Sequence, residues 1–210
     1  ALTVNGNVSI DGGTIKLDGN YPTGTDNVAL GDTALDSGSL SGGCNVAIGK
    51  ASMTTNTSGT KNVAIGRQSM NNNTTGGSNV ALGDQALFSN ISASDNTAVG
   101  KDALGVNTTG CQNVAVGATS LDANTTGNMN TAVGRSALTT NTIGCCNTAL
   151  GRTSLELNVS GNFNVAVGKD SLANNTTADY NTAVGFQSLV LNTTGCCNTA
   201  VGYQALKTNQ

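Results

Sequence analysis

Residues 113–129 read NVAVGATSLDANTTGNM, and this 17-residue unit decides how the rest of the chain is interpreted. Its first residue recurs along the chain at one interval of 18 residues, followed by nine intervals of 17. The recurring residues are Asn27, Asn45, Asn62, Asn79, Asn96, Asn113, Asn130, Asn147, Asn164, Asn181 and Asn198. A fixed short period is typical of solenoids, in which each repeat forms one coil. We therefore expect about eleven coils over residues 27–210.

Each unit contains two short apolar runs separated by turn residues. Residues 113–117 alternate in polarity and end in Gly117, a second run ends at Leu121, and residues 124–127 read NTTG. The runs are too short for helices, so the unit predicts two short strands per coil. The glycine supplies the positive φ of a sharp corner. The fold class is therefore an all-β parallel β-solenoid, or β-roll, whose coils lie about 4.8 Å apart along a rod of roughly 50 Å.

Stacking places each asparagine of the recurring column above its equivalent in the previous coil. A side-chain amide can then donate to one neighbour and accept from another, which satisfies polar groups inside a narrow solenoid. We interpret the whole column, Asn27 to Asn198, as a structural asparagine ladder. Residues 1–26 precede the repeats, and the alternating stretch 2–10 indicates a β lead-in, either an edge strand or a hairpin.

Composition argues against several functional classes. The chain of 210 residues carries 9 basic and 12 acidic residues and has a net charge of −3, so it lacks the positive surface on which affinity for nucleic acid depends. No apolar run approaches the roughly 20 residues needed to insert through a membrane. The sequence begins at Ala1 without a signal-peptide pattern and ends partway into a further repeat, so we expect a piece of a longer protein.

The residues offer no recognisable catalytic or metal-binding pattern. The absence of histidine removes the commonest general base and zinc ligand. The acidic residues are scattered over different positions of the repeat, whereas a glycosidase needs a converging pair. The glycine-rich stretches lack the lysine of a phosphate-binding loop, and the repeats lack the calcium pattern of other β-rolls. We expect no enzyme activity, no cofactor and no metal.

The predicted interior is thin. Each coil offers about four small or medium apolar side chains, such as Val165, Ala166, Val167 and Leu172. Because apolar area removed from water is the main source of stability, we expect chains to associate. We expect the alanine column to allow neighbouring chains to approach closely. Its members include Ala98, Ala115, Ala132, Ala149, Ala166 and Ala183.

The repeats resemble two families of fibrous proteins. The units NVAIG at residues 45–49 and 62–66 are similar to head repeats of trimeric autotransporter adhesins. The unit NTAVGFQSL at 181–189, followed by NTTG at 192–195, is similar to repeats in bacteriophage tail fibres, notably those of cyanophages. The second resemblance is the closer one, because it also covers the lead-in segment.

The tail-fibre resemblance implies a homotrimeric shaft on a virion. Such a shaft is a rigid spacer that supports attachment to a host receptor, and its partners are its own copies and other fibre or baseplate proteins. The adhesin resemblance implies the alternative, an extracellular protein at a bacterial surface that binds host matrix or glycan.

Six cysteines occupy the two positions before the recurring asparagine: Cys44, Cys111, Cys145, Cys146, Cys196 and Cys197. Cysteine-bearing coils are at least two coils apart, which exceeds the reach of a disulfide within one chain. In a trimer, copies of Cys145, Cys146, Cys196 and Cys197 would lie at common levels and could form interchain disulfides. The alternative is that these thiols are small, partly buried apolar side chains.

The position after the corner glycine holds six of the nine basic residues: Lys50, Arg67, Lys101, Arg135, Arg152 and Lys169. We interpret this column as a solvated face. In the last two coils the column changes to Phe186 and Tyr203, which could contact a glycan or pack against a further domain.

Overall fold

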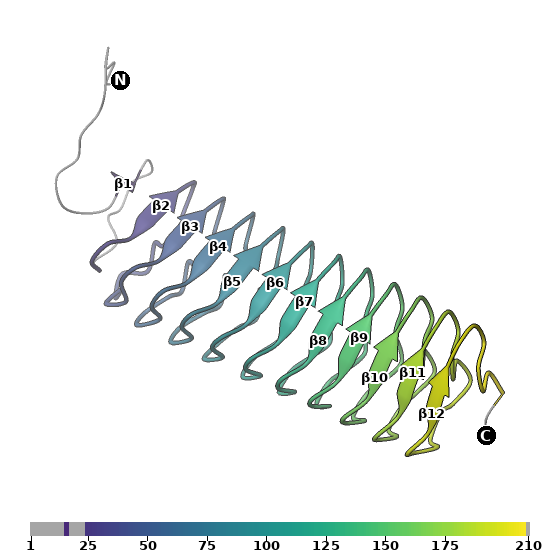
Figure 1. The fold of residues 1–210 in the computed structure, drawn as a ribbon. Helices are drawn as coiled ribbons and strands as arrows, with labels where there is room; N and C mark the ends of the chain where they lie inside the picture. The colour runs from purple at the N-terminus through teal and green to yellow at the C-terminus, as the bar shows by residue number, and fades with distance from the viewer. Residues whose placement is uncertain (1–14, 17–23, 209–210) are drawn as a thin grey trace, which may run out of the picture.

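The computed structural model describes residues 15–16 and 24–208. Within these residues, twelve strands form one sheet in chain order, and the strands β2 to β12 lie side by side along a rod (Figure 1). The strands are β1 Ile15–Lys16, β2 Val28–Leu30, β3 Val46–Ile48, β4 Val63–Ile65, β5 Val80–Leu82, β6 Thr97–Val99, β7 Val114–Val116, β8 Thr131–Val133, β9 Thr148–Leu150, β10 Val165–Val167, β11 Thr182–Val184 and β12 Thr199–Val201.

Every neighbouring pair of strands is parallel, and the register from β3 onward advances by one repeat. Ala115 of β7, for example, pairs with Ala132 of β8. Parallel neighbours need a crossover connection, and here the remaining residues of each 17-residue coil provide it without a helix in the described residues. The fold is therefore a parallel β-solenoid, as the period predicted.

The prediction of two strands per coil is wrong, because the second apolar run is a series of turns. Thr119 and Leu121 both have left-handed backbone conformations, with φ of 55° and 49°. Their N–H groups still bond to neighbouring coils, Thr119 to the carbonyl of Lys101 at 2.9 Å and Leu121 to that of Ala137 at 3.0 Å. Hydrogen bonding between coils is therefore kept, but the alternating sign of φ curls the chain instead of extending it.

The core lies inside the single chain and is built from alanine and leucine. Ala115 in the middle of β7 and Leu121 in the turn run are both completely buried, and their equivalents form one continuous hydrophobic cluster. The prediction that the alanine column faces neighbouring chains is therefore wrong. Successive side chains of a strand point to opposite faces, so a buried alanine requires its two neighbours to point outward. Val165 and Val167, which we expected in the interior, accordingly lie on the outer face.

Two physical effects require glycine at the corner position of each coil. Gly117 has a φ of 135°, in the region that side chains disfavour, which confirms the expected positive φ. A Cβ atom on Gly117 would also lie 2.6 Å from the carbonyl carbon and oxygen of Gly134 in the next coil. The glycine therefore permits both the corner and the close stacking of corners.

The lead-in segment contributes one described strand. In β1, Ile15 pairs with Val28 and Lys16 pairs with Ala29, so the segment adds a parallel strand before the first coil. The stretch 2–10, for which we expected an edge strand or hairpin, lies outside the described residues.

Candidate functional site

The recurring asparagine column forms a continuous hydrogen-bonded ladder inside the solenoid. Asn113 illustrates the pattern: its Oδ1 accepts the backbone N–H of Asn130 at 2.9 Å and the side-chain amide of Asn130 at 3.2 Å. Its Nδ2 donates to the carbonyl of Gly127 at 2.9 Å. Asn27 through Asn181 are buried, whereas Asn198 in the last coil is half-buried. These amides connect coils and serve the fold.

A second asparagine ladder runs parallel to the first and was missing from the residues that we singled out. Asn124 donates to Oδ1 of Asn107 at 2.8 Å and to the carbonyl of Gly127 at 3.0 Å. The carbonyl of Gly127 therefore accepts one amide from each ladder. The signal was present in the sequence, because the asparagine of the NTTG stretch also recurs every 17 residues. Its members are Asn56, Asn73, Asn90, Asn107, Asn124, Asn141, Asn158, Asn175 and Asn192.

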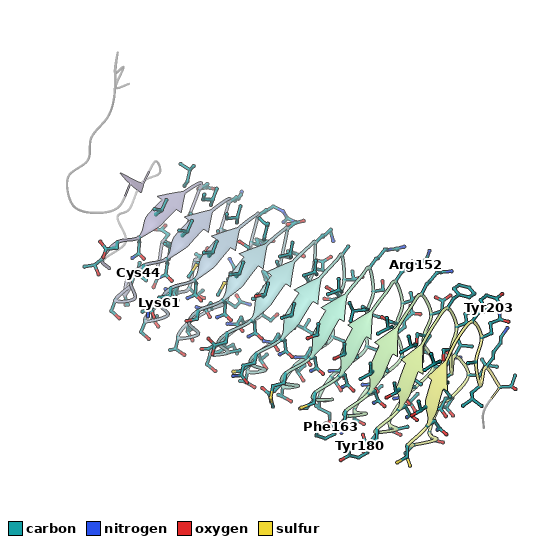
Figure 2. All side chains as sticks on the ribbon, in the orientation of Figure 1. Cys44, Lys61, Arg152, Phe163, Tyr180 and Tyr203 are labelled. Atoms are coloured by element: carbon teal, nitrogen blue, oxygen red, sulfur yellow. The ribbon has the colours of Figure 1, made fainter. Side chains whose placement is uncertain are left out.

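Cys44 lies on the edge of the sheet where the strands begin (Figure 2), and all six cysteines occupy the same two positions of the repeat, just before each strand. Two of them accept hydrogen bonds from the preceding coil: Cys111 Sγ from the N–H of Ser94 at 3.4 Å, and Cys145 Sγ from the N–H of Asn128 at 3.3 Å. In the intervening coil, Oδ1 of Asn128 accepts the N–H of Cys111 at 2.7 Å. Any side chain with an acceptor serves at this position, so these two thiols have a structural role within one chain.

The thiols of the C-terminal pair, Cys196 and Cys197, are exposed, and those of Cys145 and Cys146 are half-buried. A hydrogen bond with Cys196 raises the pKa of the Cys197 thiol, followed in effect by burial and by the charges of Cys196 and Asp179. None of the six cysteines is bonded within the chain, and pairing between chains stays a prediction.

The outer face of the sheet carries two columns of mostly aliphatic side chains along its whole length. The position after the buried alanine is always valine, isoleucine or leucine, and the position before it is valine or threonine. Val80, Leu82 and Leu150, in coils within the stack, are 38%, 45% and 40% exposed on this face, and most other members are half-buried in the single chain. A flat, continuous aliphatic surface of this kind is unusual on a protein that stays alone in water.

The opposite edge, where each strand ends, holds the basic column and two stacked aromatic rings. Arg152 and Tyr203 lie on this edge, away from Cys44, Phe163 and Tyr180 (Figure 2). The rings of Phe186 and Tyr203 stack with their centroids 5.6 Å apart. Stacking covers the facing sides of both rings, which a glycan would otherwise use, although Tyr203 as a whole is 74% exposed.

A second stacked pair, Phe163 and Tyr180, lies on the cysteine edge and was not among our candidates. Its ring centroids are 5.1 Å apart and the rings are nearly parallel, at 2°. The two residues are one repeat apart, so the 17-residue period could have predicted the stack. Both side chains are at least half exposed.

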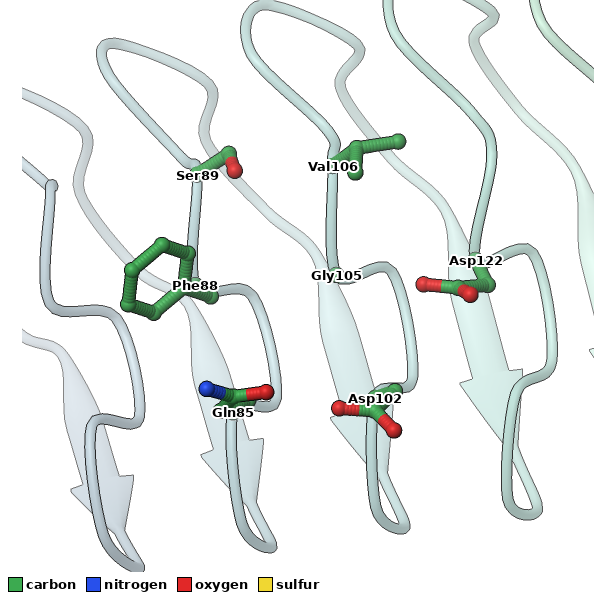
Figure 3. A pocket seen from close by; sticks show the side chains of 7 residues that line it. All are labelled: Gln85, Phe88, Ser89, Asp102, Gly105, Val106 and Asp122. Atoms are coloured by element: carbon green, nitrogen blue, oxygen red, sulfur yellow. The ribbon is translucent and has the colours of Figure 1, made fainter.

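A cavity of about 320 Å³ opens on the flank where Gly105 interrupts a column of larger side chains (Figure 3). Phe88 and Asp122 stand on either side of Gly105, and Gln85 and Asp102 line the adjacent column. Burial raises the pKa of the Asp122 carboxyl, and the charge of Asp102 adds to the shift while Lys101 opposes it. The cavity is thus a shallow, mildly acidic notch with one aromatic wall.

Comparisons with known proteins found no matching family model, no similar curated protein and no similar solved structure. Among the described residues, no group of three or more cysteine, aspartate or glutamate side chains is placed to hold a metal ion. The same residues contain no helix long and apolar enough to cross a membrane.

Proposed function

We propose that this chain is the shaft of a homotrimeric fibre on a phage tail, a rigid spacer that supports attachment of the particle to a host receptor. The observation that carries the proposal is the aliphatic outer face, because it runs along the whole stack of coils. The sequence resemblance to tail-fibre repeats supplies the virion setting and the number of chains. The expected partners are identical chains and other fibre or baseplate proteins.

The solenoid has the construction of a rigid spacer. Each coil is bonded to both neighbours through its strand, through its turn run and through two buried amide ladders. These bonds run along the rod axis, so bending the rod has to stretch several of them at every coil. Because buried amides are costly to leave unpaired, the resistance is shared along the chain.

The outer face has the size and chemistry of a contact between copies. Eleven strands about 4.8 Å apart and three residues wide give a face of roughly 50 by 10 Å, or about 500 Å². This area equals the largest apolar patches on ordinary monomers, which often mark contacts. Since alanines fill the interior of one chain, burying the outer valines and leucines would supply the apolar area that the thin core lacks.

The alternative function is an adhesin head at a bacterial surface. It is favoured by the basic and aromatic side chains along the exposed edge, which a purely mechanical shaft does not need. In that case the solenoid flank would itself bind host matrix or glycan through repeated weak contacts.

The test is the mass of the chain in solution by light scattering, for the natural sequence and for two double variants. We expect a threefold mass for the natural sequence. The variant Val116→Lys with Val133→Lys places charges on the aliphatic face and should be monomeric. The control Val106→Lys with Leu157→Lys changes two side chains that are each 43% exposed away from that face, and should stay trimeric.

A monomeric natural chain would overturn the trimer. Gel electrophoresis without reductant then reports on the cysteines. A covalent trimer that collapses with reductant would support interchain bonds through Cys145, Cys146, Cys196 or Cys197, and a single-chain band would show that the thiols stay free.

A further inference from the structure

We infer that five consecutive coils carry a binding strip for a linear acidic polysaccharide on the edge where the strands end. The basic–aromatic strip consists of Arg135, Arg152, Lys169, Phe186 and Tyr203, one residue from each coil at the same position of the repeat. Consecutive members are about 4.8 Å apart, so the strip extends over roughly 19 Å. Binding of a polysaccharide by this strip goes beyond the proposed spacer function and does not depend on the number of chains in the fibre.

Ion pairing separates this strip from the earlier part of the same column. In the first five coils the cations face carboxylates: Lys50 lies 3.7 Å from Asp32, and Arg67 lies 3.0 Å from Asp84. Lys101 pairs with Asp102. Three cations therefore meet three carboxylates, and this half of the column is neutral. Ala118, in the following coil, then interrupts the charges.

The second half of the column has excess positive charge. Within the described residues, the guanidinium groups of Arg135 and Arg152 have no hydrogen bond or ion pair, and both side chains are exposed. Only Lys169 has a carboxylate partner, Asp170 at 3.2 Å. Burial acts to raise the pKa of Asp170, but hydrogen bonds from Thr153 and Lys169 and the charge of Lys169 together lower it below its usual value, so this carboxylate is ionised at neutral pH. Three cations thus face one carboxylate on a chain whose net charge is −3.

Aromatic rings continue the strip without a break. The ammonium of Lys169 lies 5.3 Å from the ring centroid of Phe186, in a cation–π contact. Phe186 in turn stacks on Tyr203, with the ring centroids 5.6 Å apart. The order along the rod is therefore two free guanidinium groups, one ammonium in contact with a ring, and a stacked pair of aromatic rings.

This order fits an extended anionic sugar polymer. Guanidinium groups bind carboxylates and sulfates through paired N–H donors, and an aromatic face packs against the C–H face of a sugar ring. A sugar unit in an extended chain is about as long as the spacing between coils, so a polymer lying along the strip places about one sugar beside each coil. The net negative charge of the whole chain disfavours binding of a nucleic acid, whose charge density is far higher than that of an acidic polysaccharide.

The experiment measures binding of the 210-residue chain to polygalacturonate at low salt, with single-stranded DNA and poly-aspartate as comparison polymers. The double variant Arg135→Ser with Arg152→Ser should weaken polygalacturonate binding about tenfold or more. The matched control is Lys50→Ser with Arg67→Ser, which removes the same charge from the same column where carboxylates already neutralise it. This control should change binding less than about twofold.

A further variant separates sugar recognition from charge alone. Tyr203→Ser should weaken binding to polygalacturonate and leave poly-aspartate binding unchanged, because only the sugar polymer offers a C–H face to the ring. Equal losses in the two double variants would overturn the strip, as would no binding by the natural chain. Binding of single-stranded DNA as tight as that of polygalacturonate would overturn the assignment to a polysaccharide. None of these results changes the solution mass that tests the fibre proposal.

Discussion

Asn113→Ala tests whether the buried amide ladder holds the coils together. The side chain of Asn113 makes three hydrogen bonds, to the carbonyl of Gly127 and from the backbone and side chain of Asn130. Two of the three partners have a second bond. Gly127 still accepts from Asn124 at 3.0 Å, and the amide of Asn130 still donates to Gly144 at 2.8 Å. The backbone N–H of Asn130 is therefore the one group left unpaired.

The expected loss follows from this accounting. An unpaired buried N–H costs roughly 1–3 kcal/mol, and each lost bond whose partner keeps another contributes about 0.5 kcal/mol or more. The free energy of unfolding should thus fall by about 2–4 kcal/mol. The matched control is Asn174→Ala, the same chemical change at a half-buried asparagine with no side-chain hydrogen bond among the described residues. It should alter the free energy of unfolding by less than about 0.5 kcal/mol.

Two measurements check the prediction at equal protein concentration. Urea denaturation compares the two variants with the natural chain. Amide hydrogen exchange reports the local effect, and exchange at the N–H of Asn130 should accelerate in Asn113→Ala while exchange in distant coils is unchanged. Equal stability of the two variants, or unchanged exchange at Asn130, would refute the argument that the ladder satisfies buried groups coil by coil.

The corner glycines and the acidic notch give two further predictions. Gly117→Ala should cost more than about 2 kcal/mol in thermal or urea unfolding, because its φ is positive and its Cβ would meet the backbone of Gly134. Gly105→Ala should cost less, since its φ is not positive and its Cβ would meet the movable Asp122 carboxylate at 2.6 Å, with the nearest backbone atom, the carbonyl oxygen of Asp102, at 3.3 Å; equal losses would contradict this contrast. Because burial raises the pKa of Asp122, ionisation removes stability as pH rises through that pKa. Asp122→Asn should therefore raise the melting temperature at pH 7 but not at pH 3. The same gain at both pH values would show that ionisation of Asp122 is not the cause.

Much of the fold could be predicted from spacing alone. The 17-residue interval indicated the number of coils, the stacking register and the ladder that includes Asn113. The same interval would also have predicted the second ladder and the stack of Phe163 on Tyr180, because equivalent residues of adjacent coils must lie above one another. The structure of the second run was harder to predict, since Thr119 and Leu121 adopt left-handed conformations for which no local residue type is a reliable signal.

The sequence by itself determined that the chain is a stack of repeated coils. A constant period lets each coil make the same hydrogen bonds and packing contacts with the coils on either side. Only the tertiary structure decided which side of each strand faces inward. The alternation of side chains in a three-residue strand would allow either the central alanine or its two neighbours to face the interior. Which of them does so depends on how much space the opposite wall of the coil leaves. Leucine turns on that wall leave room for Ala115 and its equivalents, so the larger valines face outward. The structure likewise decided which cations are neutralised, since pairing depends on side-chain positions across coils and not on the period.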